Sequence, residues 1–250
     1  ILNWDGVSVS MDWYKGNVIS SFNRNFVVRY ELPRKTRERK KHYYPKDKAE
    51  AIVETVRKLE SFGSTLIYVP IKKSCLTYAK AYAKSLEAEQ PYVFKDNLEH
   101  RIFELVCKET YSIPTIYEYV TKGIFYHNAD LFTDVRITLE KLMQSEHPRV
   151  IIATSTLSQG VNLGVSTVIL TSVYNDRKLI SNRDFWNLAG RAGRAFVDEE
   201  GKILVAFEYD QKKTKRQNEF KKSYIVKDYF ENSNLDFVTS GLLAIISVIH

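Results

Sequence analysis

Apolar positions recur along most of the chain with two different spacings. Residues 46–61 have helical spacing, which places on one side Ala49, Ile52, Val53, Val56 and Leu59. Residues 65–69 instead form a short apolar run that suits a strand buried on both faces. Further strands are expected at 26–32, 123–127, 150–154, 167–173 and 202–208, and helices at 74–88, within 90–122 and at 130–144. Asp130 is the expected N-cap of the 130–144 helix. This alternation predicts a parallel sheet with helices on both faces.

Composition and charge narrow the possible classes only modestly. The 250 residues carry 37 Lys and Arg against 30 Asp and Glu, a net charge of +7, which suits a polyanionic partner without requiring one. Cys75 and Cys107 lie far apart, which excludes a cysteine-based zinc site and a disulfide framework and fits a reducing compartment. The longest apolar stretch, 242–249, is too short to span a bilayer, so no membrane partner is expected.

Two basic stretches and the chain ends bear on domain organisation. Residues 33–45 form a charge run that is either a solvated linker or a basic strap near a nucleic-acid path. The basic residues after 211 are consistent with a solvated helix face. The chain begins at Ile1 without a signal-peptide pattern and stops inside an apolar stretch. We therefore expect a piece of a longer protein.

Polar and small residues gather where the predicted strands end. In sheets of this kind, ligands bind outside the carboxyl ends of the strands. The candidate segments are 70–74, 127–131, 153–164 and the loop that leads to 187–194.

The last of these segments, NLAGRAGR at 187–194, follows a stretch with helical spacing. If the helix continued, Arg191 and Arg194 would share one face, and Gly190 and Gly193 would permit close approach of a ligand. Two guanidiniums there would suit phosphate. The alternative is a helix C-terminus, with glycine as the stop and the arginines on the helix dipole.

Four segments together resemble a known family. VIIATSTLSQGVNLGV (150–165) and NLAGRAGR are similar to motifs V and VI of superfamily-two helicases, in the Ski-like DExH branch. TLIYVPIKKS (65–74) resembles motif IV, and GIFYHNADL (123–131) resembles that branch's GVxxHHAGL segment. The resemblance spans about residues 62–210, in the family's order. The chain departs from the family patterns at Asn187, Asn128, Asp130 and Gly164.

The resemblance implies a RecA-like three-layer α/β sandwich, with a mostly parallel sheet between helices. The 250 residues contain neither a GxxxxGK[ST] phosphate loop nor a DExH box, which the family carries on its first lobe. The chain is therefore expected to be the second lobe. The implied division is 1–45 as the end of the first lobe or the linker, 46–210 as the helicase C-terminal lobe, and 211–250 as the start of a C-terminal helical extension.

For the nucleotide, the resemblance implies contacts from motifs V and VI. Arg194 is assigned the arginine-finger role and Arg191 a phosphate or inter-lobe contact, and the reverse assignment stays open. Gly160, Asn162, Asn187 and Gly190 are the expected nucleotide-side residues. ATP with Mg²⁺ would be held mainly by the first lobe.

For the nucleic acid, the implied contacts are Thr154, Ser155, Thr156, Lys72, Lys73, Ser74 and His127. Each has a plain structural alternative. The hydroxyl residues 154–156 would also serve as N-caps, lysines in a loop are usually solvated, and a single histidine is often structural. Phosphate contacts give affinity without sequence information, which suits a motor that moves along any sequence.

Two functions therefore compete. The first is the second motor lobe of an ATP-dependent helicase acting on single-stranded DNA or RNA, in the cytoplasm, or in the nucleus of a eukaryote. The second is a helicase-derived module that binds nucleic acid or protein without ATP turnover. An unrelated small-molecule enzyme ranks last, because no GxGxxG or nucleophile constellation is present. In either case the isolated chain is expected to lack ATPase activity.

Overall fold

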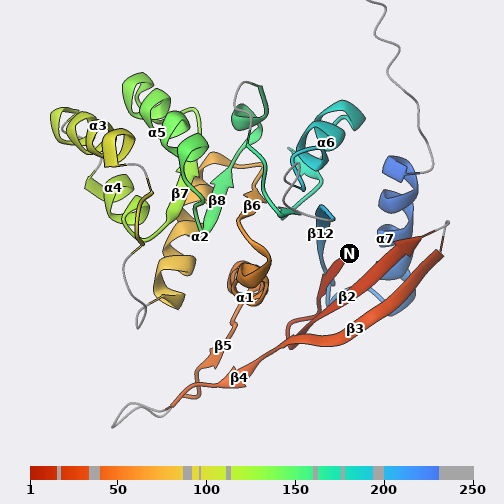
Figure 1. Ribbon diagram of the computed structural model, residues 1–250. Helices are drawn as coiled ribbons and strands as arrows, with labels where there is room; N and C mark the ends of the chain where they lie inside the picture. Colours follow the sequence, from red (N-terminus) through yellow and green to blue (C-terminus); the bar gives the residue numbers. More distant parts are fainter. Residues whose placement is uncertain are drawn as a thin grey trace, which may run out of the picture.

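The architecture was obtained from a computed structural model of the chain. It describes residues 1–15, 18–33, 40–86, 92–95, 97–110, 114–159, 163–175, 178–193 and 200–230. Within these ranges the centre of the molecule is an eight-stranded sheet, flanked by helices on both faces (Figure 1).

The sheet is parallel over most of its width. Its strand order is β3-β2-β1-β12-β9-β6-β8-β7, and the six strands from β1 to β7 in this order pair in parallel. β2 and β3 add an antiparallel hairpin at one edge. The strands are β1 (Leu2–Trp4), β2 (Ser8–Lys15), β3 (Val18–Val28), β6 (Thr65–Tyr68), β7 (Ile124–His127), β8 (Val150–Ala153), β9 (Thr167–Leu170) and β12 (Lys202–Glu208). Two small sheets pair β4 (Tyr30–Glu31) with β5 (Tyr43–Tyr44) and β10 (Tyr174–Asn175) with β11 (Lys178–Leu179).

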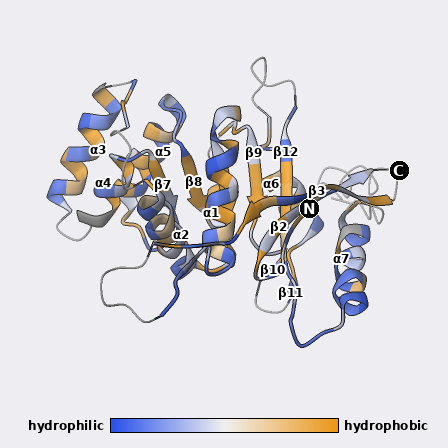
Figure 2. Cartoon of the chain, turned by 90° about the horizontal axis from the view of Figure 1, so that it is seen from below, coloured by the Kyte–Doolittle hydropathy of each residue, from blue (hydrophilic) through white to orange (hydrophobic). Residues whose placement is uncertain are grey.

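Helical layers explain why the central strands are so apolar. Every residue of β6, β7, β8 and β9 is buried, and the strands stand out as hydrophobic in Figure 2. Figure 1 shows α1 and α2 on one face of the sheet and α5 and α6 on the other. The helices are α1 (Lys48–Leu59), α2 (Lys72–Ser85), α3 (Asn97–Glu109), α4 (Pro114–Val120), α5 (Thr133–Ser145), α6 (Asn182–Ala189) and α7 (Lys215–Phe230), with 3₁₀ turns at Glu60–Phe62 (η1) and Ser155–Gln159 (η2). The predicted fold class is confirmed.

Two local expectations were wrong. Asp130 does not cap the helix after β7, because α5 begins at Thr133 behind Phe132, whose side chain makes no capping hydrogen bond. The Asp130 carboxylate lies instead 2.7 Å from the Lys72 ammonium. Helix α2 also begins earlier than expected, so Lys72, Lys73 and Ser74 form its first turn and do not lie in a loop. The unclear region 90–122 contains the two helices α3 and α4.

Strands β1, β2 and β3, near the start of the chain, belong to the same sheet as β12 and the other central strands. β1 pairs in parallel with β12, with Leu2 opposite Ala206, and Trp4 is buried in the common core. The central sheet therefore combines strands from before and after residue 45. The division into 1–45, 46–210 and 211–250, and the assignment of the first segment to a first lobe or a linker, stay predictions.

Helix α7 follows β12 and packs beside the β2–β3 hairpin (Figure 1). The apolar stretch 242–249 lies outside the described residues. No helix in the described part of the chain is long and apolar enough to cross a membrane. Cys75 is a buried free thiol and Cys107 a partly buried one.

Candidate nucleotide and nucleic-acid sites

The carboxyl ends of three neighbouring strands bring together the expected nucleic-acid contacts. β8 lies between β6 and β7, with Ala153 opposite both Tyr68 and His127. Lys72 follows β6, His127 ends β7 and Thr154 follows β8. Because parallel strands end at the same edge, these residues meet although they are far apart in sequence.

His127 is a buried residue held by two polar partners. Its side chain is 1% exposed, and its Nε2 lies 2.7 Å from Oε1 of Glu140 on α5. A carboxylate only accepts hydrogen bonds, so Nε2 carries the proton and donates. The other nitrogen, Nδ1, is then the acceptor for the Thr156 hydroxyl, 3.5 Å away. Burial lowers the pKa of His127, whereas the hydrogen bond to Glu140 raises it and only partly opposes the burial. The imidazole is therefore neutral at neutral pH.

The three hydroxyl residues after β8 differ in access. Thr154 is buried, its hydroxyl lies 3.0 Å from that of Thr156, and its N–H donates to the His127 carbonyl at 3.3 Å. Ser155 and Thr156 are exposed at the start of η2. The Leu157 N–H donates to the Thr154 carbonyl, as expected at the start of a helical turn. Thr154 therefore serves the local structure, and Ser155 and Thr156 are the hydroxyls open to solvent.

The first turn of α2 presents two exposed lysines at the same edge. Lys72 forms an ion pair with Asp130 at 2.7 Å, in which both side chains are more than half exposed. Lys73 is exposed, and Ser74 is half-buried with its N–H donating to the Ile71 carbonyl. An exposed pair of this kind contributes little to stability, so it leaves the Lys72 ammonium available to exchange Asp130 for another anion.

The NLAGRAGR segment forms a helix end followed by a loop. Helix α6 begins after Ser181, whose hydroxyl accepts the Asp184 N–H at 3.0 Å, and ends at Ala189 with Gly190 as its cap. Asn187 is exposed on its last turn. The helix therefore does not continue through Arg191, so of the two alternatives the described residues support the helix C-terminus, whereas Arg194 lies outside them. Gly190 keeps a right-handed conformation with φ −65°, and the helix ends because the next residues pair with Val165.

Beyond α6, the chain pairs with the end of motif V. Val165 forms a parallel bridge with Ala192. The Val165 N–H donates to the Arg191 carbonyl at 3.1 Å, and the Gly193 N–H donates to the Val165 carbonyl at 2.7 Å. The Arg191 guanidinium donates to the Leu157 carbonyl in η2 at 3.2 Å. Burial lowers the pKa of Arg191, but a guanidinium stays charged at neutral pH. Motifs V and VI thus form one connected unit.

Glycines make this junction possible. Gly193 has φ +90°, a conformation that side chains rarely adopt. A Cβ on Gly201, just before β12, would lie 2.4 Å from the Ala192 carbonyl oxygen. The close approach at Gly193 is therefore to the chain's own backbone at Gly201. Whether Gly190 also admits a ligand stays a prediction.

Three of the expected site residues, Gly160, Asn162 and Arg194, lie outside the described residues. Sequence reasoning missed Glu140, because nothing in the local pattern of α5 marks this carboxylate as the partner of a histidine 13 residues earlier. Sequence reasoning also missed Leu157. Arg191 contacts its backbone carbonyl, which every residue type has, so the sequence gives no signal for this contact. Within the described part of the chain, no group of three or more His, Cys, Asp or Glu is arranged to hold a metal ion.

The mostly parallel sheet between two helical layers, with its polar residues at the strand ends, is a RecA-like α/β sandwich. No family model matches the chain. The chain is 37% identical over 249 residues to the Hachiman protein HamB of Bacillus cereus, covering 96% of this chain and 21% of that protein. It is 32% identical over 157 residues to the human protein Helicase POLQ-like, covering 59% of this chain and 14% of that protein.

A third relative is the ATP-dependent DNA helicase Hel308 of Aeropyrum pernix, 34% identical over 93 residues, covering 36% of this chain and 13% of that protein. The chain belongs to the Ski-like branch of superfamily-two helicases. It spans about a fifth or less of the length of these relatives.

Proposed function

We propose that this chain is the second RecA-like lobe of an ATP-dependent helicase that moves along single-stranded DNA or RNA. Its family membership supports a helicase-related domain. The four motif-like segments resemble those of the family's second lobe, and the phosphate loop and DExH box of its first lobe are absent from the 250 residues. The partner would be a first RecA-like lobe of the same protein.

The junction of motifs V and VI is the observation that carries this proposal. Arg191 contacts η2 through the Leu157 carbonyl, and η2 begins with the exposed Ser155 and Thr156. A shift of the loop after α6 would therefore be passed directly to the proposed strand-binding hydroxyls. This is the connection that a motor requires between its ATP side and its nucleic-acid side.

On the ATP side, Arg194 would act as the arginine finger, and Arg191 would hold the loop in place and contact phosphate or the first lobe. Phosphoryl transfer is catalysed mainly by positioning and by neutralising the developing charge. Because the finger would reach the γ-phosphate only when the lobes close, hydrolysis would be coupled to domain movement. Mg²⁺ would be held mainly by the first lobe. Gly160, Asn162, Asn187 and Gly190 are proposed on the nucleotide side.

On the nucleic-acid side, the exposed groups Ser155, Thr156 and Lys73 would bind phosphates directly. Lys72 and Ser74 would contribute from the same helical turn. Thr154 and His127 would act by holding Thr156, since both are buried. Contacts to phosphate alone would bind any sequence.

The test is the nucleic-acid-stimulated ATPase activity of the longer protein that would contain this chain. An Arg194→Ala variant should lower kcat by at least about two orders of magnitude, because arginine fingers contribute roughly 10³ to 10⁵ in rate. Arg183→Ala removes the same charge from the exposed start of α6 and should leave kcat within about twofold.

The competing function is a binding module without ATP turnover. An inactive wild-type protein, or an Arg194→Ala variant as active as wild type, would favour that module and exclude the finger role. Loss of the stimulated ATPase activity in Arg194→Ala but not in Arg183→Ala supports the proposed motor function.

A further inference from the structure

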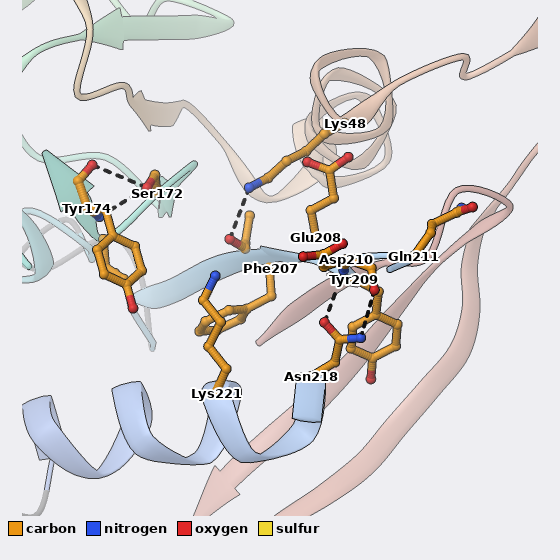
Figure 3. A pocket seen from close by; sticks show the side chains of 12 residues that line it. Lys48, Ser172, Tyr174, Phe207, Glu208, Tyr209, Asp210, Gln211, Asn218 and Lys221 are labelled. Carbon is orange, nitrogen blue, oxygen red and sulfur yellow. Dashed lines mark hydrogen bonds between the residues drawn. The ribbon is translucent and has the colours of Figure 1, made fainter. Parts of the chain in front are cut away.

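A pocket lies beside the proposed strand-binding residues and plays no part in the function proposed so far. Its volume is about 470 Å³, and it is lined by Ser172–Tyr174 after β9, by residues 206–211 at the end of β12, and by Lys48 of α1 and Lys221 of α7. Figure 3 shows the amines of Lys48 and Lys221 pointing into the pocket from opposite walls.

The two lysines are cations without close carboxylate partners. The Lys48 ammonium donates to the Ala206 carbonyl at 3.3 Å. The Lys221 ammonium lies over the Tyr174 ring, 5.4 Å from its centroid. Among the described residues, neither lysine forms an ion pair within 4.0 Å. Burial lowers the pKa of Lys48, Glu208 opposes this shift, and the charge of Lys221 adds to it. An anion bound between the two lysines would stabilise the buried Lys48 ammonium and offset its repulsion by Lys221.

Next to the pocket, α7 has an exposed face that carries the aromatic rings of Phe220 and Tyr224, which we call the outer face of α7. Phe220 is 74% and Tyr224 56% exposed, and they are four residues apart and so neighbours on one helical face. Lys221 follows Phe220 in sequence and lies on the pocket side of this face, and Arg216 and Lys227 are also exposed on α7. Cations alternating with open aromatic rings suit single-stranded nucleic acid, whose phosphates bind the cations and whose bases stack on the rings.

Strand order places this surface next to the motif residues. Lys72 and Thr154 follow β6 and β8, and His127 ends β7. The pocket lies at the carboxyl ends of β9 and β12. In the sheet, β9 is the direct neighbour of β6, and β12 is the next strand. Adjacent strands are about 4.8 Å apart, so a bound chain leaving Lys72 reaches the pocket within a few strand spacings.

We propose, building on the function proposed above, that the pocket and the outer face of α7 bind the continuation of the same single strand. A phosphate lies between Lys48 and Lys221, and bases stack on Phe220 and Tyr224. Glu208 and Asp210 also line the pocket, and their negative charge favours a phosphate position at the two lysine ammonium groups over one beside these carboxylates. The occupant is single-stranded nucleic acid of any sequence.

The first test is fluorescence anisotropy of the 250-residue chain with a fluorescein-labelled oligothymidylate of about 20 nucleotides. Lys48→Gln/Lys221→Gln should weaken binding about tenfold at low salt. It should also reduce the slope of log affinity against log salt by about 0.7 for each phosphate that the variant no longer neutralises. The charge-matched control is Lys84→Gln/Lys141→Gln, two exposed lysines late in α2 and α5, towards the opposite edge of the sheet. This control should change affinity by less than about twofold.

The second test concerns the rings. Phe220→Ala and Tyr224→Ala should each weaken binding at least about fivefold with little change in the salt slope, because stacking is not ionic. Phe62→Ala is the control, an exposed ring under Lys202 next to the amino end of β6. Circular dichroism melting of each variant reports whether it is folded.

The outcomes separate this inference from the proposed function. If Lys72→Gln/Lys73→Gln weakens binding while the pocket and ring variants bind like wild type, the inference is wrong and the proposed strand contacts stand. If the wild-type chain binds no oligonucleotide at low salt, this inference and the proposed strand contacts at Lys72 and Lys73 both fail. If the pocket and ring variants weaken binding and their controls do not, the inference is supported.

Discussion

The sequence marked His127 as a candidate site residue but did not predict its hydrogen-bond partners in the fold. The resemblance placed it at the nucleic-acid side, with a structural role as the alternative. In the fold it is buried and hydrogen bonded to Glu140, and it holds Thr156 at the edge of the sheet. These contacts show a structural role for His127, and its role toward nucleic acid stays a prediction.

This setting makes a prediction about pH. The folded pKa of His127 lies below the ordinary value of 6.5, so the unfolded state binds more protons as the pH falls through about 6.5. The free energy of unfolding should therefore decrease between pH 7.5 and the folded pKa. An NMR titration of the imidazole should give a pKa below 6.5 in wild type and lower still in Glu140→Gln, because the favourable carboxylate is removed.

Glu118→Gln is the control, since Glu118 is exposed on α4, and it should leave the His127 pKa unchanged. A wild-type His127 pKa at or above 6.5 would show that burial does not dominate this site.

At the scale of elements, α7 connects parts of the chain that are far apart in sequence. The Lys222 ammonium lies 2.9 Å from Asp12 on β2, and its side chain is 4% exposed. The Tyr229 hydroxyl donates to the Ile180 carbonyl at 2.7 Å, and its ring stacks on Phe185 of α6 with centroids 4.3 Å apart. Helix α7 therefore holds the β2–β3 hairpin and the helix that leads to Arg191 in one arrangement.

Breaking the buried ion pair between Lys222 and Asp12 should strongly destabilise the fold. Lys222→Met should lower the free energy of unfolding by about 3 to 5 kcal/mol, because it leaves the Asp12 carboxylate buried without its cation. Adding Asp12→Asn should recover part of this loss. Urea unfolding of the chain measures both. Lys221→Met, one residue away and exposed, should cost less than about 0.5 kcal/mol. Equal losses from the two lysine substitutions would mean that the ion pair contributes nothing specific.

At the scale of the whole molecule, the candidate contacts for nucleic acid lie along one edge of the sheet. They run from β7 through β8, β6 and β9 to β12. The motif VI loop lies instead beside the segment that precedes β9, where Ala192 pairs with Val165. The fold thus separates the proposed nucleic-acid edge from the proposed ATP side, and η2 joins the two.

A prediction for the whole molecule follows from the motifs that the chain contains. The isolated 250 residues should show no ATPase activity above background, because they carry neither a GxxxxGK[ST] loop nor a DExH box to hold phosphate and Mg²⁺. A phosphate-release assay on a clean preparation, run beside the isolated Arg194→Ala chain, measures this. Turnover present in wild type and abolished in the variant would contradict the prediction, whereas equal turnover in both would identify a contaminant.

The sequence by itself determined the elements and their class. Helical spacing at residues 46–61 and the apolar runs at 65–69 and 150–154 predicted α1, β6 and β8 closely, because these patterns depend on neighbours within one or two turns. The sequence did not predict the structure at Asp130 or at the end of α6. Asp130 lies in a turn, where its N–H donates to the Asn128 side-chain oxygen, and α5 begins only at Thr133. The loop after Gly190 pairs with Val165.

Only the tertiary structure decided which distant residues meet. The contact of His127 with Glu140, that of Arg191 with Leu157, and the pocket shared by Lys48 and Lys221 all depend on strand order and helix placement. A local pattern specifies which face of an element is apolar, and therefore which face is buried. The choice of partner for that face is made by the packing of the whole sheet, where the free energy comes from many contacts distant in sequence.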